Sequence, residues 1–128
     1  MKITAWLPRP LHHRAVRDFR SAAVSGDAAR LESMLAPDVA VVVDGGDDEQ
    51  PALRMVTGTF DAVALLLHGL GRKPGLDVVE RQVNGQSGLL LIADGEPTAA
   101  MTIDFAGALV SVVWIRLHPL ALRHGLTV

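Results

Sequence analysis

The sequence predicts an α+β fold in which three N-terminal helices pack on a curved, mostly antiparallel sheet. Two observations lead to this prediction. Apolar residues recur at helical spacing up to about residue 70, interrupted by one short β-branched run, and from Gly75 onward apolar runs of strand length alternate with turn pairs. A chain of 128 residues suits one domain with one core.

The first elements are expected to be two helices and a strand. Residues 12–24 carry apolar side chains three and four positions apart, and Gly26 would end this helix. Asp27 can cap a short second helix, which Pro37 would prevent from continuing. Residues 39–43 form a β-branched run between a proline and a glycine turn, so we expect a buried strand there.

A third helix is expected after a polar loop. Thr57 or Thr59 can cap it, its apolar residues recur at helical spacing, and Gly69 and Gly71 close it. The turn pairs beyond it predict an antiparallel meander. We place its four strands near residues 76–83, 88–93, 97–105 and 108–117.

Several of these strands are apolar on both faces. In the last strand, Val110, Val112 and Trp114 alternate with the apolar residues Val113 and Ile115. Helices can cover one face of such a sheet, and the other face then needs a second covering layer. A second subunit is the natural candidate, so a homodimer is expected.

Composition excludes several classes of protein. The chain has no cysteine, which rules out disulfides, thiolate nucleophiles and cysteine-ligated zinc. No apolar run approaches the roughly 20 residues of a membrane span, and no signal-peptide layout is present, so we expect a cytoplasmic protein without membrane association. A net charge of −2 and a total of five Phe and Trp residues give no basic groove or stacking platform, so direct nucleic-acid binding is not expected.

The N-terminal motif Trp6-Leu7-Pro8-Arg9-Pro10 resembles the Trp-Leu-Pro-Glu-Pro linker that precedes the C-terminal SnoaL-like domain of certain extracytoplasmic-function sigma factors. The two prolines favour extended backbone before a helix. We therefore divide the chain into a linker-like arm, residues 1–11, and a cone domain, residues 12–128. The alternative is an apolar arm that docks on its own domain through Trp6 and Leu7.

The resemblance to this SnoaL-like extension covers nearly the whole chain. Its interior segments are Pro51-Ala52-Leu53-Arg54, Val56-x-Gly58, Val63-Ala64 through Gly69-Leu70, and Val83-Asn84-Gly85-Gln86-Ser87-Gly88. Asp44-Gly45-Gly46 occupies the place of the family's Asp-Gly-Gly-Gly-Lys turn. Here Asp47 and Asp48 replace the last Gly and the Lys, so any contact made through that lysine is lost. The family's closing Asn-Pro-Asp-Lys-Leu reads His118-Pro119-Leu120-Ala121-Leu122 in this chain.

The resemblance implies a nuclear transport factor 2-like cone with a regulatory role. In the family, this domain follows sigma domains that bind DNA and polymerase, and it acts on them through the linker and the glycine turn. It therefore implies sigma-factor domains or RNA polymerase as partners. We expect no cofactor. The implied partner-binding residues are Trp6, Pro8, Pro10, Asp44, Gly45 and Gly46. An Asp before two glycines is also an ordinary turn former.

An enzymatic role is the alternative hypothesis, because related cones include ketosteroid isomerases, polyketide cyclases and limonene epoxide hydrolases. Asp104 and His68 are the candidate acid and base. The competing interpretations place Asp104 in water beside the Ala106-Gly107 turn and His68 at an exposed helix end. The chain has no tyrosine, so an isomerase-type phenolic donor is excluded. We favour a non-catalytic domain.

A third hypothesis is a sensor of a small apolar ligand. Trp114 and Arg116 share a strand face and would supply an aromatic wall beside a guanidinium, although Trp114 also suits a core or a dimer interface. Adjacent helical residues point about 100° apart, so His12 and His13 cannot hold one metal together, and no metal site is predicted.

Overall fold

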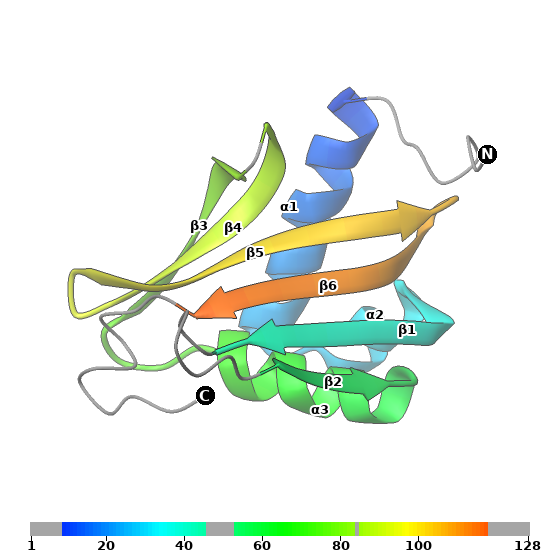
Figure 1. Cartoon of the computed structure of the whole chain (residues 1–128), viewed down its shortest axis with the longest axis horizontal. Helices are drawn as coiled ribbons and strands as arrows, with labels where there is room; N and C mark the ends of the chain where they lie inside the picture. Colours follow the sequence, from blue (N-terminus) through cyan, green and yellow to red (C-terminus); the bar gives the residue numbers. More distant parts are fainter. Residues whose placement is uncertain (1–8, 46–52, 84, 118–128) are drawn as a thin grey trace.

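A computed structural model describes residues 9–45, 53–83 and 85–117, which form helices and one sheet (Figure 1). In chain order the elements are α1 (Arg9–Ser25), α2 (Ala28–Ser33), β1 (Leu35–Asp44), β2 (Leu53–Thr57), α3 (Thr59–Leu70), β3 (Leu76–Val83), β4 (Gln86–Ala93), β5 (Glu96–Ala106) and β6 (Leu109–Leu117).

The sheet has six strands in the order β2-β1-β6-β5-β4-β3. The pair β1–β6 is parallel and the other neighbouring strands are antiparallel. The α+β prediction and the four-strand meander after residue 75 are confirmed. The bounds of the four strands agree with the expected ones to within two residues.

One strand was not predicted, and this changes the position of the third helix. The segment that we expected to be a polar loop contains β2, which pairs with β1 along the sheet edge. Consequently α3 follows two strands, so only α1 and α2 precede the sheet. Four of the five β2 residues are exposed, so their sequence lacks the buried face by which a strand is usually recognised.

The helix ends show how local sequence acts. α1 begins at Arg9, three residues earlier than expected, and Pro10 lies in its first turn, where no backbone N–H is needed. Asp27 caps α2 as predicted, because its carboxylate accepts a hydrogen bond from the backbone N–H of Arg30. The predicted threonine cap of α3 is wrong: Gly58 is the N-cap and no side chain caps the helix.

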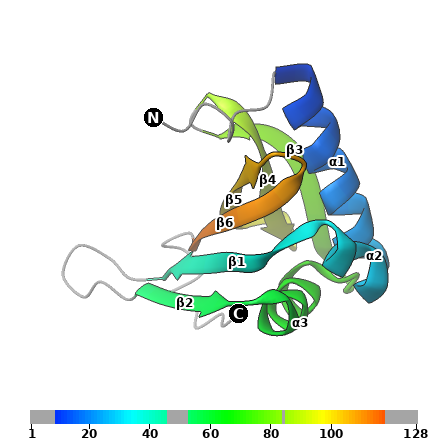
Figure 2. The same ribbon diagram turned by 90° about the vertical axis from the view of Figure 1, so that its right-hand side faces the viewer.

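The core lies between one face of the curved sheet and the three helices, all of which run along that side (Figure 2). α1 contributes residues at helical spacing, and the inward positions of the strands alternate with outward ones. The largest fully buried side chains are Phe19, Leu31, Leu66, Leu70, Leu89, Met101, Ile103, Val16, Val39, Val41, Val110 and Val113. Among the described helices, none is long and apolar enough to cross a bilayer.

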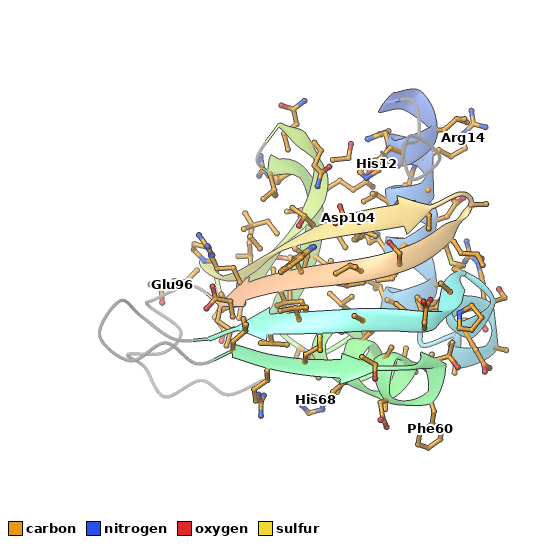
Figure 3. The ribbon with its side chains drawn as sticks, turned by 45° about the vertical axis from the view of Figure 1, so that its right-hand side comes forward. His12, Arg14, Phe60, His68, Glu96 and Asp104 are labelled. Atoms are coloured by element: carbon orange, nitrogen blue, oxygen red, sulfur yellow. The ribbon has the colours of Figure 1, made fainter. Side chains whose placement is uncertain are left out.

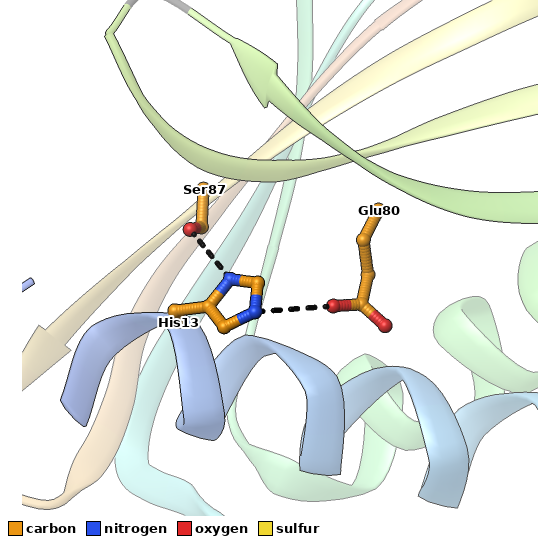
Figure 4. A network of polar contacts seen from close by, with 3 residues as sticks. All are labelled: His13, Glu80 and Ser87. Atoms are coloured by element: carbon orange, nitrogen blue, oxygen red, sulfur yellow. Dashed lines mark hydrogen bonds and ion pairs between the residues drawn. The ribbon is translucent and has the colours of Figure 1, made fainter. Parts of the chain in front are cut away.

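Polar contacts fix α1 on the strands. His13 lies between Ser87 and Glu80, with Nδ1 3.1 Å from the serine Oγ and Nε2 3.8 Å from a glutamate oxygen (Figure 4). His12 donates from Nε2 to the carbonyl of Ile103 at 3.0 Å. The two histidines therefore hold different strands.

Candidate functional site

A cavity of about 340 Å³, partly open to solvent, lies between the C-terminal end of α3 and the inner face of the sheet. This volume is within the range of small-molecule sites. Its lining comes from α3, the segment that follows it, and strands β3 to β6. The lining residues are Leu65, Leu66, His68, Gly69, Leu70, Lys73, Pro74, Leu76, Leu91, Ala93, Thr98, Ala99, Met101, Ile115 and Leu117.

The lining is almost wholly aliphatic. Its polar side chains are those of His68, Lys73 and Thr98, and it includes no Phe, Trp, Asp or Glu. The Thr98 hydroxyl donates to the carbonyl of Leu91 at 3.3 Å, so its hydrogen is already used within the sheet. A ligand in this cavity would be held mainly by contact with methyl and methylene groups.

The residues that α3 contributes to the cavity wall are positioned by the spacing of the helix. Leu66 and Leu70, one turn apart, are buried against the sheet, while His68 is exposed at the rim. Gly71 ends the helix, and its N–H donates to the carbonyl of Leu67. The side chain of Lys73 reaches back to the helix, where its ammonium donates a hydrogen bond to the carbonyl of His68. This contact places a positive charge at the negative end of the helix dipole.

The segment after α3 is fastened to the turn between β4 and β5. Gly75 has φ of +80°, a conformation that favours glycine, and its carbonyl accepts a hydrogen bond from the N–H of Asp94 at 2.8 Å. A Cβ on Gly75 would lie 2.3 Å from an Asp94 carboxylate oxygen. This close contact joins the two segments that border the cavity.

Asp104 lies on the other face of the sheet. Its neighbours Ile103 and Phe105 are buried toward the helices, whereas Asp104 is exposed and accepts a hydrogen bond from Trp114 Nε1 at 3.1 Å. Figure 3 shows Asp104 on β5 well away from His68 on α3. The structure therefore does not bring the predicted acid and base together, and their role stays a prediction.

Trp114 and Arg116 share a strand face as expected, but this face points away from the cavity. The side chain of Arg116 is 81% exposed and forms an ion pair with Asp44, Nε to Oδ2, at 3.8 Å. The alternate residues Ile115 and Leu117 line the cavity instead. Sequence reasoning selected the polar-aromatic face of β6 and missed its aliphatic face.

The outer face is apolar over three adjacent strands. Register places Met55, Val42 and Trp114 in one row across β2, β1 and β6. Leu53 lies in the next row beside Asp44. The exposed fractions are 69% for Leu53, 64% for Met55 and 47% for Trp114. We call these three residues the outer apolar patch.

Only some of the predicted partner-binding residues lie in the part of the chain that the structure describes. Trp6, Pro8 and Gly46 lie outside the described residues, as does the side chain of Pro10. Asp44 ends β1, and Gly45 follows it against Leu117, where a Cβ on Gly45 would lie 3.1 Å from Cδ1 of the leucine. The turn therefore touches a residue that lines the cavity.

Within the described ranges, no three His, Asp or Glu side chains are grouped so that they could hold a metal ion. His12 and His13 each contact their own strand partners, as described above.

Comparison with known proteins gives matches among solved structures. No family model and no curated protein matches the sequence. An NTF2-like protein from Burkholderia xenovorans is 15% identical, with a TM-score of 0.64, over 95% of this chain and 100% of its own. The extracytoplasmic-function sigma factor SigJ of Mycobacterium tuberculosis is 22% identical, with a TM-score of 0.61, over 86% of this chain and 43% of its own.

An epoxide hydrolase of Mycobacterium tuberculosis is also similar, with 16% identity and a TM-score of 0.58 over 92% of this chain and 90% of its own. This chain thus spans the full length of one such protein and less than half of SigJ. At these identities the likeness concerns architecture alone. The α+β order, the curved six-stranded sheet and these matches together show that the chain has the NTF2-like fold.

Proposed function

We propose that this chain is a non-catalytic, SnoaL-like regulatory domain that binds a small apolar ligand in its cavity. The observation that carries the proposal is the aliphatic cavity of about 340 Å³, whose lining contains no carboxylate. Proton transfer needs a positioned acid or base beside the substrate. Here the titratable groups among the lining residues are His68 and Lys73, and both are exposed.

The regulatory part of the proposal rests on the contact between cavity and turn. Leu117 lines the cavity and lies against Gly45, and Arg116 next to it pairs with Asp44. A ligand that presses on Leu117 acts on the segment that the sequence resemblance implies as a partner-binding turn. Ligand binding can then change the conformation that the turn presents.

The proposed partners are sigma-factor domains or RNA polymerase, reached through Asp44-Gly45-Gly46 and the linker containing Trp6, Pro8 and Pro10. Two observations support this: the linker and turn motifs in the sequence, and the structural likeness to SigJ. A cytoplasmic place of action belongs to the same proposal.

A homodimer is the second partner proposal, and the outer apolar patch favours it. Large apolar side chains exposed on adjacent strands mark an interaction surface. The patch is bordered by both charge signs, with Arg116 beside Asp44 and with Asp104 bonded to Trp114, so two copies related by a twofold axis can pair opposite charges. The enzyme hypothesis is an alternative, supported by the likeness to an epoxide hydrolase.

Calorimetric titration with octan-1-ol tests the ligand proposal. The alcohol should bind the wild-type chain with a negative heat-capacity change, because apolar surface is buried. Ala99 is buried and lines the cavity, so Ala99→Leu fills part of the space and should weaken binding by about tenfold or more. Phe60→Lys, at an exposed position of α3 outside the lining, is the control and should bind normally. Equal binding by Ala99→Leu, or no binding by the wild type, would overturn the proposal.

A further inference from the structure

We infer that the cavity takes an unbranched alkyl carboxylate, with the chain inside and the carboxylate held at the mouth by the ammonium of Lys73. This inference rests on the proposed ligand-binding function and adds the chemical class of the ligand. Neither the fold nor the sequence resemblance specifies that class.

The position of Lys73 provides the cation. Its side chain lines the mouth of the cavity, and its ammonium is held there by the hydrogen bond to the carbonyl of His68. An ammonium has three donors, so two remain for a ligand. Within 4.0 Å of this ammonium the described residues supply no carboxylate.

The charges around the mouth favour an anion. Lys73 and His68 are the lining residues on this rim, and the lining includes no Asp or Glu. The carboxylate of Asp94, in the turn that borders the cavity, lies against the backbone of Gly75, and Asp94 is not part of the lining. A cation at the edge of an apolar cavity attracts a negative head group more strongly than a neutral one, and it repels a positive one.

The interior favours a flexible aliphatic tail. It has no Phe or Trp for stacking with a flat ring system, and the one hydroxyl inside, that of Thr98, already donates to Leu91. If a methylene group takes roughly the 30 Å³ of a water molecule, a cavity of about 340 Å³ holds about ten carbon atoms. Chains of eight to ten carbons are the expected length.

Titration of three eight-carbon probes tests the inference, namely octanoate, octan-1-ol and octylamine. Octanoate should bind the wild-type chain about fivefold more tightly than octylamine, the size expected for one partly exposed ion pair. Lys73→Met should weaken octanoate by about fivefold and leave octan-1-ol unchanged, which also shows that the variant is folded. Lys73→Arg should keep the preference, and Arg72→Met, one residue away and outside the lining, should behave as wild type.

The outcomes separate the two proposals. If octan-1-ol binds but octanoate shows no advantage, or if its advantage persists in Lys73→Met, the carboxylate inference is overturned and the ligand-binding function stands. If none of the three probes binds, both proposals fail.

Discussion

The indole of Trp114 donates a hydrogen bond to the carboxylate of Asp104 at 3.1 Å, across neighbouring strands on the side of the sheet that the helices leave open. Each residue was a candidate for a different site inside the cone. The hydrogen bond fixes both of them on the outer face instead. Asp104 and Trp114 therefore lie on this surface, whereas His68 lies at the rim of a cavity whose lining is mostly aliphatic.

Removal of this carboxylate should affect the surface and not the cavity. Asp104→Ala should lower the free energy of unfolding by about 1 kcal/mol, because it removes a partly solvated hydrogen bond to a charged group. Its affinity for octan-1-ol should be unchanged. Chemical denaturation measures the free energy of unfolding, and calorimetry measures the affinity for octan-1-ol. Asp18→Asn, at an exposed position of α1, is the control. Loss of ligand binding in Asp104→Ala would return Asp104 to the functional site.

Gly88 should be required for close packing of β4 and β5. A Cβ there would lie 2.4 Å from the backbone oxygen of Met101 and about 3 Å from Val83. Intrinsic preference alone predicts that Gly→Ala in a strand stabilises by about 0.5–1 kcal/mol. We expect instead that Gly88→Ala destabilises by about 1–3 kcal/mol. Thermal or urea unfolding gives the sign, and a more stable variant would refute this explanation of the glycine.

Gly95→Ala is the control for the Gly88 prediction. Gly95 has φ of +85°, and a Cβ there would meet no atom within 4 Å. Gly95→Ala should lower the free energy of unfolding by about 1 kcal/mol, because of the unfavourable backbone conformation alone.

The outer apolar patch should mediate self-association. Met55→Lys places a charge in the middle of the proposed interface and should shift the chain from dimer to monomer at micromolar concentration. Phe60→Lys is the matched control, because Phe60 is 86% exposed and lies on α3, which contributes no residue to the patch. Analytical ultracentrifugation distinguishes the species. A wild-type monomer, or equal dissociation by both variants, would remove the dimer proposal.

Ligand binding should be sensed at the glycine turn. If Leu117 transmits contact to Gly45, saturation with octan-1-ol should slow amide hydrogen exchange at Gly45 by about twofold or more. The amide of Gly26, which bonds to the carbonyl of Ala23 at the end of α1, should not change and serves as the internal control. Unchanged exchange at Gly45 with a filled cavity would contradict the regulatory connection.

The sequence was most informative where pattern and turn chemistry agree. Asp94 and Gly95 both have positive φ, so the turn pair that predicted the β4–β5 hairpin is built as expected. β2 could not be recognised, because an exposed edge strand draws its stability from pairing with β1 and not from a buried face of its own. The sequence likewise shows that Met55 is apolar, but it does not show what packs against this side chain on the outer face of the sheet.

The site was less predictable than the fold. Candidate catalytic residues are chosen from a sequence because they are polar. This cavity is instead lined mainly by aliphatic residues from five elements that are far apart in the sequence. Whether such residues close up into a solid core or leave a space depends on helix placement. Small residues such as Ala99 at inward positions are the signal that was available.

The central claim is that the cavity is hollow and takes an apolar ligand, and methyl NMR of [methyl-¹³C]methionine protein during titration with octan-1-ol tests it most directly. Met101 lines the cavity, Met34 lies at the end of α2, and Met55 lies on the outer face. We predict a saturable shift of the Met101 signal with those of Met34 and Met55 nearly unchanged. A Met101 signal that does not move, or a shift confined to Met55, would contradict the claim.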